Sequence, residues 1–316
     1  MNDGVSNVAA SVHARLLNRA KSEGRPFNEL LQYYAMERFL YRLSRSDHRD
    51  QFVLKGALML QFWGGALVRA TKDIDLLGRE TVSVPELIEV ARSCLRTEVP
   101  EDGVRFHPES VVGEEIRIDA HYDGVRVRCS GSLGNARLHL QIDVGFGDVI
   151  TPGTSSLVYP TLLDFEAPRL LGYTPETAIA EKLEAMVVLD RANSRLKDFL
   201  DIWVLSRKQQ FVGEILSTAI GATFARRRTP IPADVPFALS PAFASDAAKQ
   251  VQWRAYVRKA RVQGPAVVLD EVVGEIRDFL MPVLTSLAKG QPFDAHWPEG
   301  GPWTGTSGED AEHAHP

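Results

Sequence analysis

The sequence predicts an α+β protein in which a mixed sheet is followed by an all-helical half. Two observations predict this division. Short apolar strands occur between residues 52 and 147, and several of them alternate with polar residues. From residue 174 onward the apolar residues recur at the three- and four-residue spacing of helices. Because the strands lie in the first half and the second half is helical, the predicted organisation is α+β.

The predicted elements of the first half begin and end at recognisable residues. Pro26 precedes the second helix, Gly56 ends the first strand, and Ser83 caps a helix with Pro85 in its first turn. In order, the elements are helices at 9–22 and 26–46, a strand at 52–54, a helix at 57–63, a strand at 69–77, a helix at 84–95, and strands at 112–120, 124–130 and 137–147.

The second half is predicted to contain only helices and loops. Thr174 suits an N-cap, Pro175 suits the first helical position, and a Pro-rich loop spans 229–241. The predicted helices are 174–189, 195–208, 212–226, 244–261 and 267–288. The remaining residues are rich in Gly, Pro, Glu and His, which is typical of disorder. The expected domains are therefore 1–170 and 171–289, followed by a disordered tail at 290–316.

Composition is that of an ordinary globular protein. The chain has 316 residues, of which 44% are hydrophobic and 24% charged, and its formal charge of −5 gives no global case for nucleic acid. No apolar run approaches the roughly 18 residues of a membrane span, and the N-terminus lacks a secretory signal. Cys94 and Cys129 have no metal-ligand or disulfide spacing, so we expect reduced, half-buried thiols in a cytoplasmic protein.

Two short motifs combine features that nucleotidyl transfer needs. Lys55-Gly56 is a tight turn between a strand and a helix, where backbone N–H groups can face phosphate. Asp73 and Asp75 follow on an apolar strand, on one face and roughly 6.5–7 Å apart. Carboxylate oxygens at that separation can hold Mg²⁺ between protein and substrate phosphates. Asp-x-Asp alone is common, but the preceding strand–Gly–helix unit strengthens the prediction of a metal site.

Asp143 is a candidate third carboxylate. It lies on the polar face of the strand at 137–147, whose other face is formed by Leu140, Ile142 and Val144 together with Leu138 and Phe146. A third metal ligand would lie at such a position. The alternative is a sheet face exposed to solvent, in which case Asp143 is merely hydrated.

Charges also occupy apolar helix faces in the second half. On a helical wheel Lys182 falls on the packing side, while Glu181 and Glu184 fall on the solvent side. Asp198 and Asp201 belong to a helix that is apolar nearly all round, so both carboxylates need partners. Arg195, three residues before Asp198, is one candidate, and a purely structural Arg–Asp pair remains an alternative.

These residues, in this order, carry a family resemblance. Lys55-Gly56, Asp73-x-Asp75, Glu181-Lys182-Leu183 and Arg195-x-Lys197-Asp198-x-x-Asp201 resemble the AbiEii/AbiGii nucleotidyltransferase toxin family, which includes the MenT toxins of mycobacteria. The stretches Met36–Ser44 and Gln252-Trp253 are also similar, so the likeness spans roughly residues 28–285.

The resemblance implies a fold, an activity and partners. The fold is a DNA polymerase β-like nucleotidyltransferase core followed by a helical half. The activity is that of a toxin from a toxin–antitoxin or abortive-infection system, transferring NMP from an NTP to RNA, with the tRNA 3′ end the expected acceptor. A cognate antitoxin encoded by a neighbouring gene is the expected protein partner, and no membrane is involved.

The resemblance also assigns roles to individual residues. Asp73 and Asp75 resemble the metal-binding pair, Lys182 the lysine that binds nucleotide phosphate, and Asp198 the aspartate of the fourth motif. Asp143 is our candidate for a further metal ligand or for the group that accepts the proton of the attacking hydroxyl. Phosphate contacts are expected from Lys55, Gly56, Arg69 and Lys182. One departure is Ala57, where many family members have Ser or Thr; the choice of NTP therefore stays open.

Two other functions remain open at this stage. A kinase or protein-nucleotidylating enzyme on the same scaffold would use a protein hydroxyl as acceptor. A non-catalytic interaction module would keep the fold without activity, and only Ala57 favours it. For RNA binding, the basic clusters are Arg226-Arg227-Arg228 and the helical set Arg254, Arg258, Lys259 and Arg261, although such clusters are usually solvated surfaces.

Overall fold

The chain forms two compact units. The computed structural model describes residues 7–64, 69–119, 122–260 and 267–305. The first unit comprises 1–62, 70–148 and 154–173, and the second comprises 63–69, 149–153 and 174–316. The boundary expected after residue 170 thus lies three residues early, and two short segments of the first half belong to the second unit.

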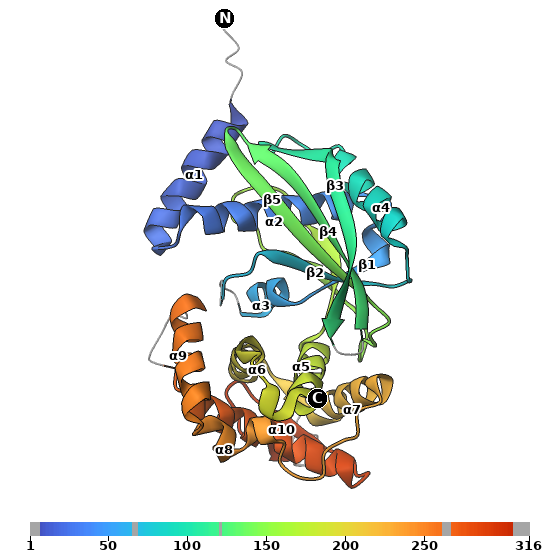
Figure 1. The fold of residues 1–316 in the computed structure, drawn as a ribbon, viewed down its shortest axis with the longest axis vertical. Helices are drawn as coiled ribbons and strands as arrows, with labels where there is room; N and C mark the ends of the chain where they lie inside the picture. Colours follow the sequence, from blue (N-terminus) through green and yellow to red (C-terminus); the bar gives the residue numbers. More distant parts are fainter. Residues whose placement is uncertain (1–6, 65–68, 120–121, 261–266, 306–316) are drawn as a thin grey trace, which may run out of the picture. The chain divides into compact units, whose positions relative to one another are not determined.

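The first unit is built on a seven-stranded mixed sheet (Figure 1), which confirms the predicted fold class. Its strand order is β3-β4-β5-β2-β1-β7-β6. The strands are β1 (Phe52–Lys55), β2 (Asp73–Gly78), β3 (Val104–Asp119), β4 (Tyr122–Leu133), β5 (Ala136–Phe146), β6 (Ser155–Val158) and β7 (Arg169–Gly172). β2 is parallel to β5 and β1 is parallel to β7, whereas the other pairs are antiparallel. The sequence did not predict β6 and β7.

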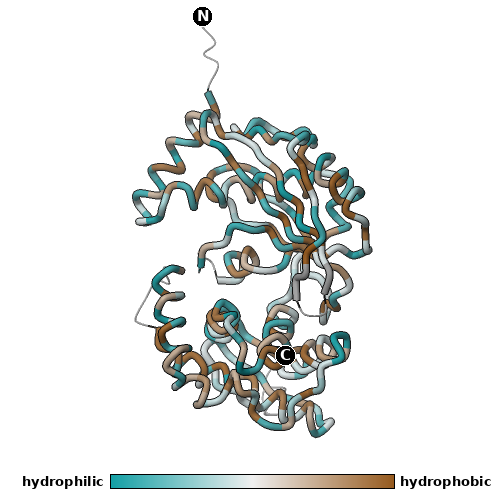
Figure 2. Tube along the Cα trace, viewed as in Figure 1, coloured by the Kyte–Doolittle hydropathy of each residue, from teal (hydrophilic) through white to brown (hydrophobic). Residues whose placement is uncertain are grey.

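Helices α2 (Phe27–Arg45) and α4 (Val84–Arg96) pack on the apolar face of this sheet. The other helices of this half of the chain are α1 (Val8–Glu23), which contacts α2, and α3 (Ala57–Gly64). Ser83 and Glu86 form the capping box that starts α4. Leu87 and Ala91 of α4 and Phe39 of α2 pack with strand residues such as Leu76 and Ile142. The alternation of hydrophobic and hydrophilic residues along β4 and β5 can be followed in Figure 2. The opposite face of these strands is therefore polar.

Helix α2 also carries buried charges. Arg42 donates to both carboxylate oxygens of Asp102, at 2.7 and 3.2 Å. Glu37 pairs with Arg38 at 2.6 Å, and its other oxygen accepts from the Leu162 N–H. Each buried charge thus has a partner, as burial requires.

The second unit consists of helices and a small sheet. The helices are α5 (Pro175–Leu189), α6 (Leu196–Lys208), α7 (Gly213–Arg227), α8 (Pro241–Ala244), α9 (Ala247–Ala260) and α10 (Leu269–Ala288). The strands β8 (Phe211–Val212), β9 (Ala295–Trp297) and β10 (Thr304–Gly305) form an antiparallel three-stranded sheet. The expectation of an all-helical second half was therefore wrong in this detail.

The expected tail also begins too early. Trp297 is buried, and its indole N–H donates to the Ser206 carbonyl at 2.7 Å. Trp303 stacks on Phe279 and donates to the Phe279 carbonyl at 2.7 Å. Residues 291–305 are thus packed onto the second unit. The contacts of the two tryptophans order a segment whose Gly- and Pro-rich composition would otherwise favour disorder. The rest of the expected tail, 306–316, lies outside the described residues.

Two further expectations can be compared with the structure. Among the described residues, no helix is long and apolar enough to cross a membrane. Cys94 and Cys129 are free thiols, as expected, but both are buried rather than half-buried. Burial raises the pKa of Cys94 to about 11 and that of Cys129 to about 12, so both stay protonated at neutral pH.

Candidate active site

The turn after β1 fits closely against an aspartate of the next strand. Gly56 has φ +72°, a conformation that favours glycine. A Cβ added at Gly56 would overlap the carboxylate of Asp75. Glycine is therefore required here for two reasons, the backbone conformation and the space that Asp75 occupies. Lys55, one residue earlier, is the register partner of Asp75 across β1 and β2.

Strand β2 presents its two aspartates on the polar face. Asp73 and Asp75 are half-buried, whereas Ile74 and Leu76 are buried in the core. This is the alternation that the sequence predicts. Antiparallel pairing with β1 and parallel pairing with β5 hold the strand in register from both sides, so the spacing of the two carboxylates is fixed by the sheet.

Asp143 lies beside this pair. In the parallel β2–β5 ladder, Asp75 is the register partner of Asp143 and Asp73 that of Gln141. Directly paired residues share a sheet face, so Asp143 is on the face of Asp73 and Asp75. Both of its oxygens accept hydrogen bonds from the Arg126 guanidinium on β4, at 2.8 and 2.7 Å. The Arg126 ion pair thus offsets the repulsion that two neighbouring carboxylates would otherwise feel.

Lys55 is tied to the first unit rather than extended into solvent. Its ammonium donates to Asp148 at 2.8 Å and to the Tyr173 hydroxyl at 3.2 Å. The Asp148 side chain is only 4% exposed. A role in binding phosphate stays a prediction, and it would require this buried ion pair to rearrange. Ala57 begins α3 and is buried, and its methyl side chain offers no hydroxyl for contact with phosphate.

Across the part of the chain that the structure describes, no three His, Cys, Asp or Glu side chains are grouped so that they could hold a metal ion. The candidate metal centre is accordingly a pair, Asp73 and Asp75, with Asp143 next to it but paired with Arg126. Two carboxylates suit Mg²⁺, which usually takes one or two protein carboxylates and completes its shell with substrate phosphates and water. The donor set therefore fits the ion.

The second unit contains a buried cluster of charges around Lys182 of α5. Its ammonium donates to Asp198 at 3.0 Å and to Asp201 at 2.7 Å, both on α6. Arg195 donates to Asp198 at 2.6 Å, and Arg69 donates to both oxygens of Asp201, at 2.7 and 2.9 Å. We call these five residues the Lys182 cluster. It includes both the Arg195–Asp198 pair and the packing-side lysine that the sequence predicts.

Burial and pairing act in opposite directions on the pKa values of this cluster. Burial alone would lower the pKa of Lys182, but the two carboxylates outweigh it and raise the pKa. Burial would raise the pKa of Asp201, but Arg69 and Lys182 hold it well below its usual range. The pKa of Asp198 is likewise lowered, against its burial, by Lys182 and Arg195. All three groups are therefore charged at neutral pH.

Sequence reasoning missed the role of Asp201 and misjudged Glu184. Asp201 binds two cations, whereas the sequence singled out Asp198 alone as a site residue. The three-residue spacing of the two aspartates is a pattern that could have revealed the pair. Glu184 was expected on the solvent side, yet it is buried and accepts from Arg227 at 2.8 Å and from the Thr229 hydroxyl at 2.6 Å.

The two basic clusters differ in exposure. Arg227 is part of a buried ion pair with Glu184, so the run 226–228 is not simply a solvated surface. On α9, Arg254, Arg258 and Lys259 are exposed. Arg261, the fourth member of that set, lies outside the described residues.

An α+β unit with a paired aspartate beside a strand–glycine–helix turn is an arrangement that suits nucleotidyl transfer. The family profile described as "Nucleotidyl transferase AbiEii toxin, Type IV TA system" matches residues 38–279. The chain therefore belongs to the AbiEii nucleotidyltransferase toxin family of type IV toxin–antitoxin systems. Enzymes of this class generally use an NTP and a divalent metal. No curated protein matches the chain.

Two crystal structures from Helicobacter pylori are similar to the chain. The structure of JHP933 is 13% identical, with a TM-score of 0.46, and the match covers 83% of this chain and 94% of that one. A candidate nucleotidyltransferase is 14% identical, with a TM-score of 0.45, and the match covers 84% of this chain and 99% of that one.

Proposed function

We propose that this toxin transfers NMP from an NTP to the 3′ end of an RNA, with tRNA as the expected acceptor, and releases pyrophosphate. The observation that carries the proposal is the pair Asp73 and Asp75. These half-buried carboxylates share one sheet face next to the Gly56 turn, in a chain of a nucleotidyltransferase family. A pair of carboxylates beside such a turn can bring a divalent metal and a triphosphate together.

Asp73 and Asp75 would hold Mg²⁺ together with phosphate oxygens of the NTP. The bound ion would supply charge stabilisation for the departing pyrophosphate. Asp143 would serve as a further ligand or accept the proton of the attacking hydroxyl. Arg126 uses one lone pair on each Asp143 oxygen, so either role would use the remaining lone pairs while the ion pair persists.

Lys182 is the proposed phosphate-binding lysine, with Asp198 as the residue that positions it. The ammonium is charged and fixed between two carboxylates, so little side-chain entropy is lost when it binds an anion. Arg69, proposed as a second phosphate contact, is fixed in the same way by Asp201.

RNA is favoured over protein as the acceptor by the exposed cations Arg254, Arg258 and Lys259 on α9. Arg254 and Arg258 are four residues apart and so share one exposed helical face, which suits a polyanion. The resulting binding should weaken steeply with salt. The antitoxin from the neighbouring gene is proposed as the partner that keeps this activity in check.

The test is incubation of the purified protein with total RNA and each α-labelled NTP in turn. We expect label in RNA, dependent on Mg²⁺, from one or a few NTPs. Asp73→Asn and Asp75→Asn should each lower incorporation by at least about 100-fold without changing the melting temperature. Asp164→Asn, which alters a fully exposed side chain, is the matched control and should stay active.

Other results would identify other activities. Protease-sensitive, RNase-resistant label would indicate a protein acceptor. Transfer of label from γ-labelled but not α-labelled NTP would indicate a kinase. A fully active Asp75→Asn protein would rule out this site.

A further inference from the structure

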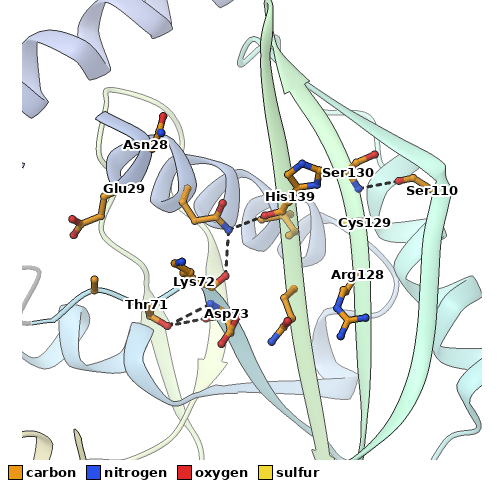
Figure 3. A pocket seen from close by; sticks show the side chains of 14 residues that line it. Asn28, Glu29, Thr71, Lys72, Asp73, Ser110, Arg128, Cys129, Ser130 and His139 are labelled. Atoms are coloured by element: carbon orange, nitrogen blue, oxygen red, sulfur yellow. Dashed lines mark hydrogen bonds between the residues drawn. The ribbon is translucent and has the colours of Figure 1, made fainter. Parts of the chain in front are cut away.

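A pocket of about 650 Å³ lies within the first unit and begins at Asp73 (Figure 3). It is formed by the start of α2, the segment before β2, and the neighbouring strands β4 and β5. Its volume is in the range of small-molecule sites. The candidate metal pair therefore has a preformed concave surface beside it.

The walls of the pocket are fixed by hydrogen bonds. The Gln32 side chain of α2 donates to the carbonyls of Lys72, at 3.2 Å, and His139, at 2.9 Å. The Tyr33 hydroxyl accepts from the Thr71 N–H at 3.1 Å. These bonds tie the helix, the segment before β2 and strand β5 together, so the pocket needs little rearrangement to bind a ligand.

Charge varies along the pocket. Asp73 lies at one edge, and Lys72 is its exposed neighbour. Arg128 is in the same row of the sheet, because Gln141 pairs with Asp73 on one side and with Arg128 on the other. In the next row away from Asp75, the residues that line the pocket are His139 and Ser130. The pocket thus runs from a carboxylate, past two cations, to the imidazole of His139 and the hydroxyl of Ser130.

Arg128 can exchange its present partner for a ligand. Its ion pair with Glu114 has a distance of 2.6 Å, but the two side chains are 47% and 50% exposed. Exposed pairs of this kind contribute little to stability. Glu29, the other acidic residue of the pocket, is already paired with Arg25. A phosphate can therefore approach Arg128 and Lys72 without strong competition.

We infer that this pocket binds the 3′-terminal nucleotide of the acceptor RNA. The inference rests on the proposed transfer to RNA and adds where the acceptor is held. The ribose hydroxyl would lie near Asp73, the phosphodiester near Lys72 and Arg128, and the base near His139 and Ser130. Lys72 and Arg128 carry two positive charges and Asp73 carries one negative charge, so the net charge of these three residues balances one phosphodiester. Because Lys72 and Arg128 are exposed, the RNA nucleotides that precede the terminal one can extend from the pocket into solvent.

The experiment compares Arg128→Ala and Lys72→Ala with Arg137→Ala. Arg137 is an exposed arginine on the same face of β5 as His139 but outside the pocket. Two quantities are measured for each protein: the KM for RNA and for NTP in the transfer reaction, and the affinity of a short single-stranded RNA by fluorescence anisotropy at several salt concentrations.

Arg128→Ala and Lys72→Ala are expected to raise the KM for RNA at least about fivefold and to leave the KM for NTP unchanged. The loss of one phosphate contact should also reduce the slope of log affinity against log salt by about 0.7. Arg137→Ala should match the wild type in every measurement. Equal melting temperatures would exclude unfolding as the cause of the changes.

Three outcomes would overturn the inference. A raised KM for NTP would assign the pocket to the nucleotide substrate. If KM values and RNA affinities are the same for Arg128→Ala, Lys72→Ala and Arg137→Ala, the acceptor RNA binds outside this pocket. In that case the proposed function would still be upheld by wild-type transfer to RNA. Wild-type transfer to protein and not to RNA would refute both.

Discussion

At the scale of single residues, the candidate site depends on close fits between neighbours. Gly56 leaves room for the Asp75 carboxylate, and Arg126 neutralises Asp143 next to it. In the second unit Lys182 is shared by Asp198 and Asp201. Each of these contacts links residues that are distant in sequence, and each can be removed separately.

Gly56→Ala should abolish transfer, because the added methyl group would displace the Asp75 carboxylate. The matched control is Gly24→Ala. Gly24 has a similar backbone conformation, with φ +63°, but no atom lies within 4 Å of an added Cβ. Both variants should lose about 1 kcal/mol of stability from backbone strain. Measured activity should fall only in Gly56→Ala; equal activity in the two variants would contradict the close fit described here.

Stability should also depend on the ionisation of Glu37. Burial raises its pKa to about 7, although Arg38 and the Leu162 N–H act in the opposite direction. The folded state therefore keeps a proton that the unfolded chain releases above its ordinary pKa of 4.5. This contribution to stability is complete below about pH 4.5 and is lost as the pH rises through about 7.

Glu37→Gln removes this titration. The stability of the variant relative to the wild type should rise by about 2–3 kcal/mol between pH 5 and pH 8, as measured by denaturant unfolding. Glu89→Gln, on an exposed side chain of α4, should show no such trend. A relative stability of Glu37→Gln that is the same at both pH values would show that Glu37 titrates normally.

At the scale of elements, the sequence predicted the strands and helices that have a periodic apolar pattern. It missed the elements that form through contacts with residues far away in sequence. The alternation along β2 and β5 placed Asp73, Asp75 and Asp143 on one polar face, and the register of the parallel strands makes them neighbours. Strands β6 and β7 have only four residues each and lie close to prolines, so no periodic pattern marks them.

The candidate site was likewise predictable only in part. Apolar helix faces revealed that Lys182 and Asp198 are unusual. The pairing of Arg69 with Asp201 joins residues 132 positions apart, and no local pattern encodes such a contact. The role of Trp297 and Trp303 in residues 291–305 was missed for the same reason, because their partners Ser206 and Phe279 are far away in sequence.

The packed C-terminal segment gives a prediction at this scale. Trp297→Ala should destabilise the protein by about 3–5 kcal/mol, because a buried indole and its hydrogen bond are lost. The neighbouring substitution His296→Ala, at a half-buried position of the same strand, should cost much less. Thermal melting of both variants checks the difference. A Trp297→Ala protein as stable as the wild type would restore the view of this segment as a disordered tail.

At the scale of the whole molecule, membership of a toxin family predicts an effect on growth. Expression of the wild-type chain in bacteria without its neighbouring antitoxin should arrest growth. Asp75→Asn and Lys182→Ala should each relieve the arrest. Asp75→Asn is the more informative variant, because Lys182→Ala also leaves two buried carboxylates without their shared cation and should lower stability. If the wild type and both variants arrest growth at equal expression, toxicity does not depend on nucleotidyl transfer.

Transfer of NMP to the 3′ end of RNA by the Asp73–Asp75 site requires a free terminal ribose diol or hydroxyl. It can be measured with α-labelled NTP and two preparations of the same tRNA, one untreated and one whose terminal ribose diol has been oxidised with periodate. The wild-type protein should label only the untreated tRNA, and Asp75→Asn should label neither. Equal labelling of the oxidised and untreated tRNA would contradict transfer to the 3′ hydroxyl.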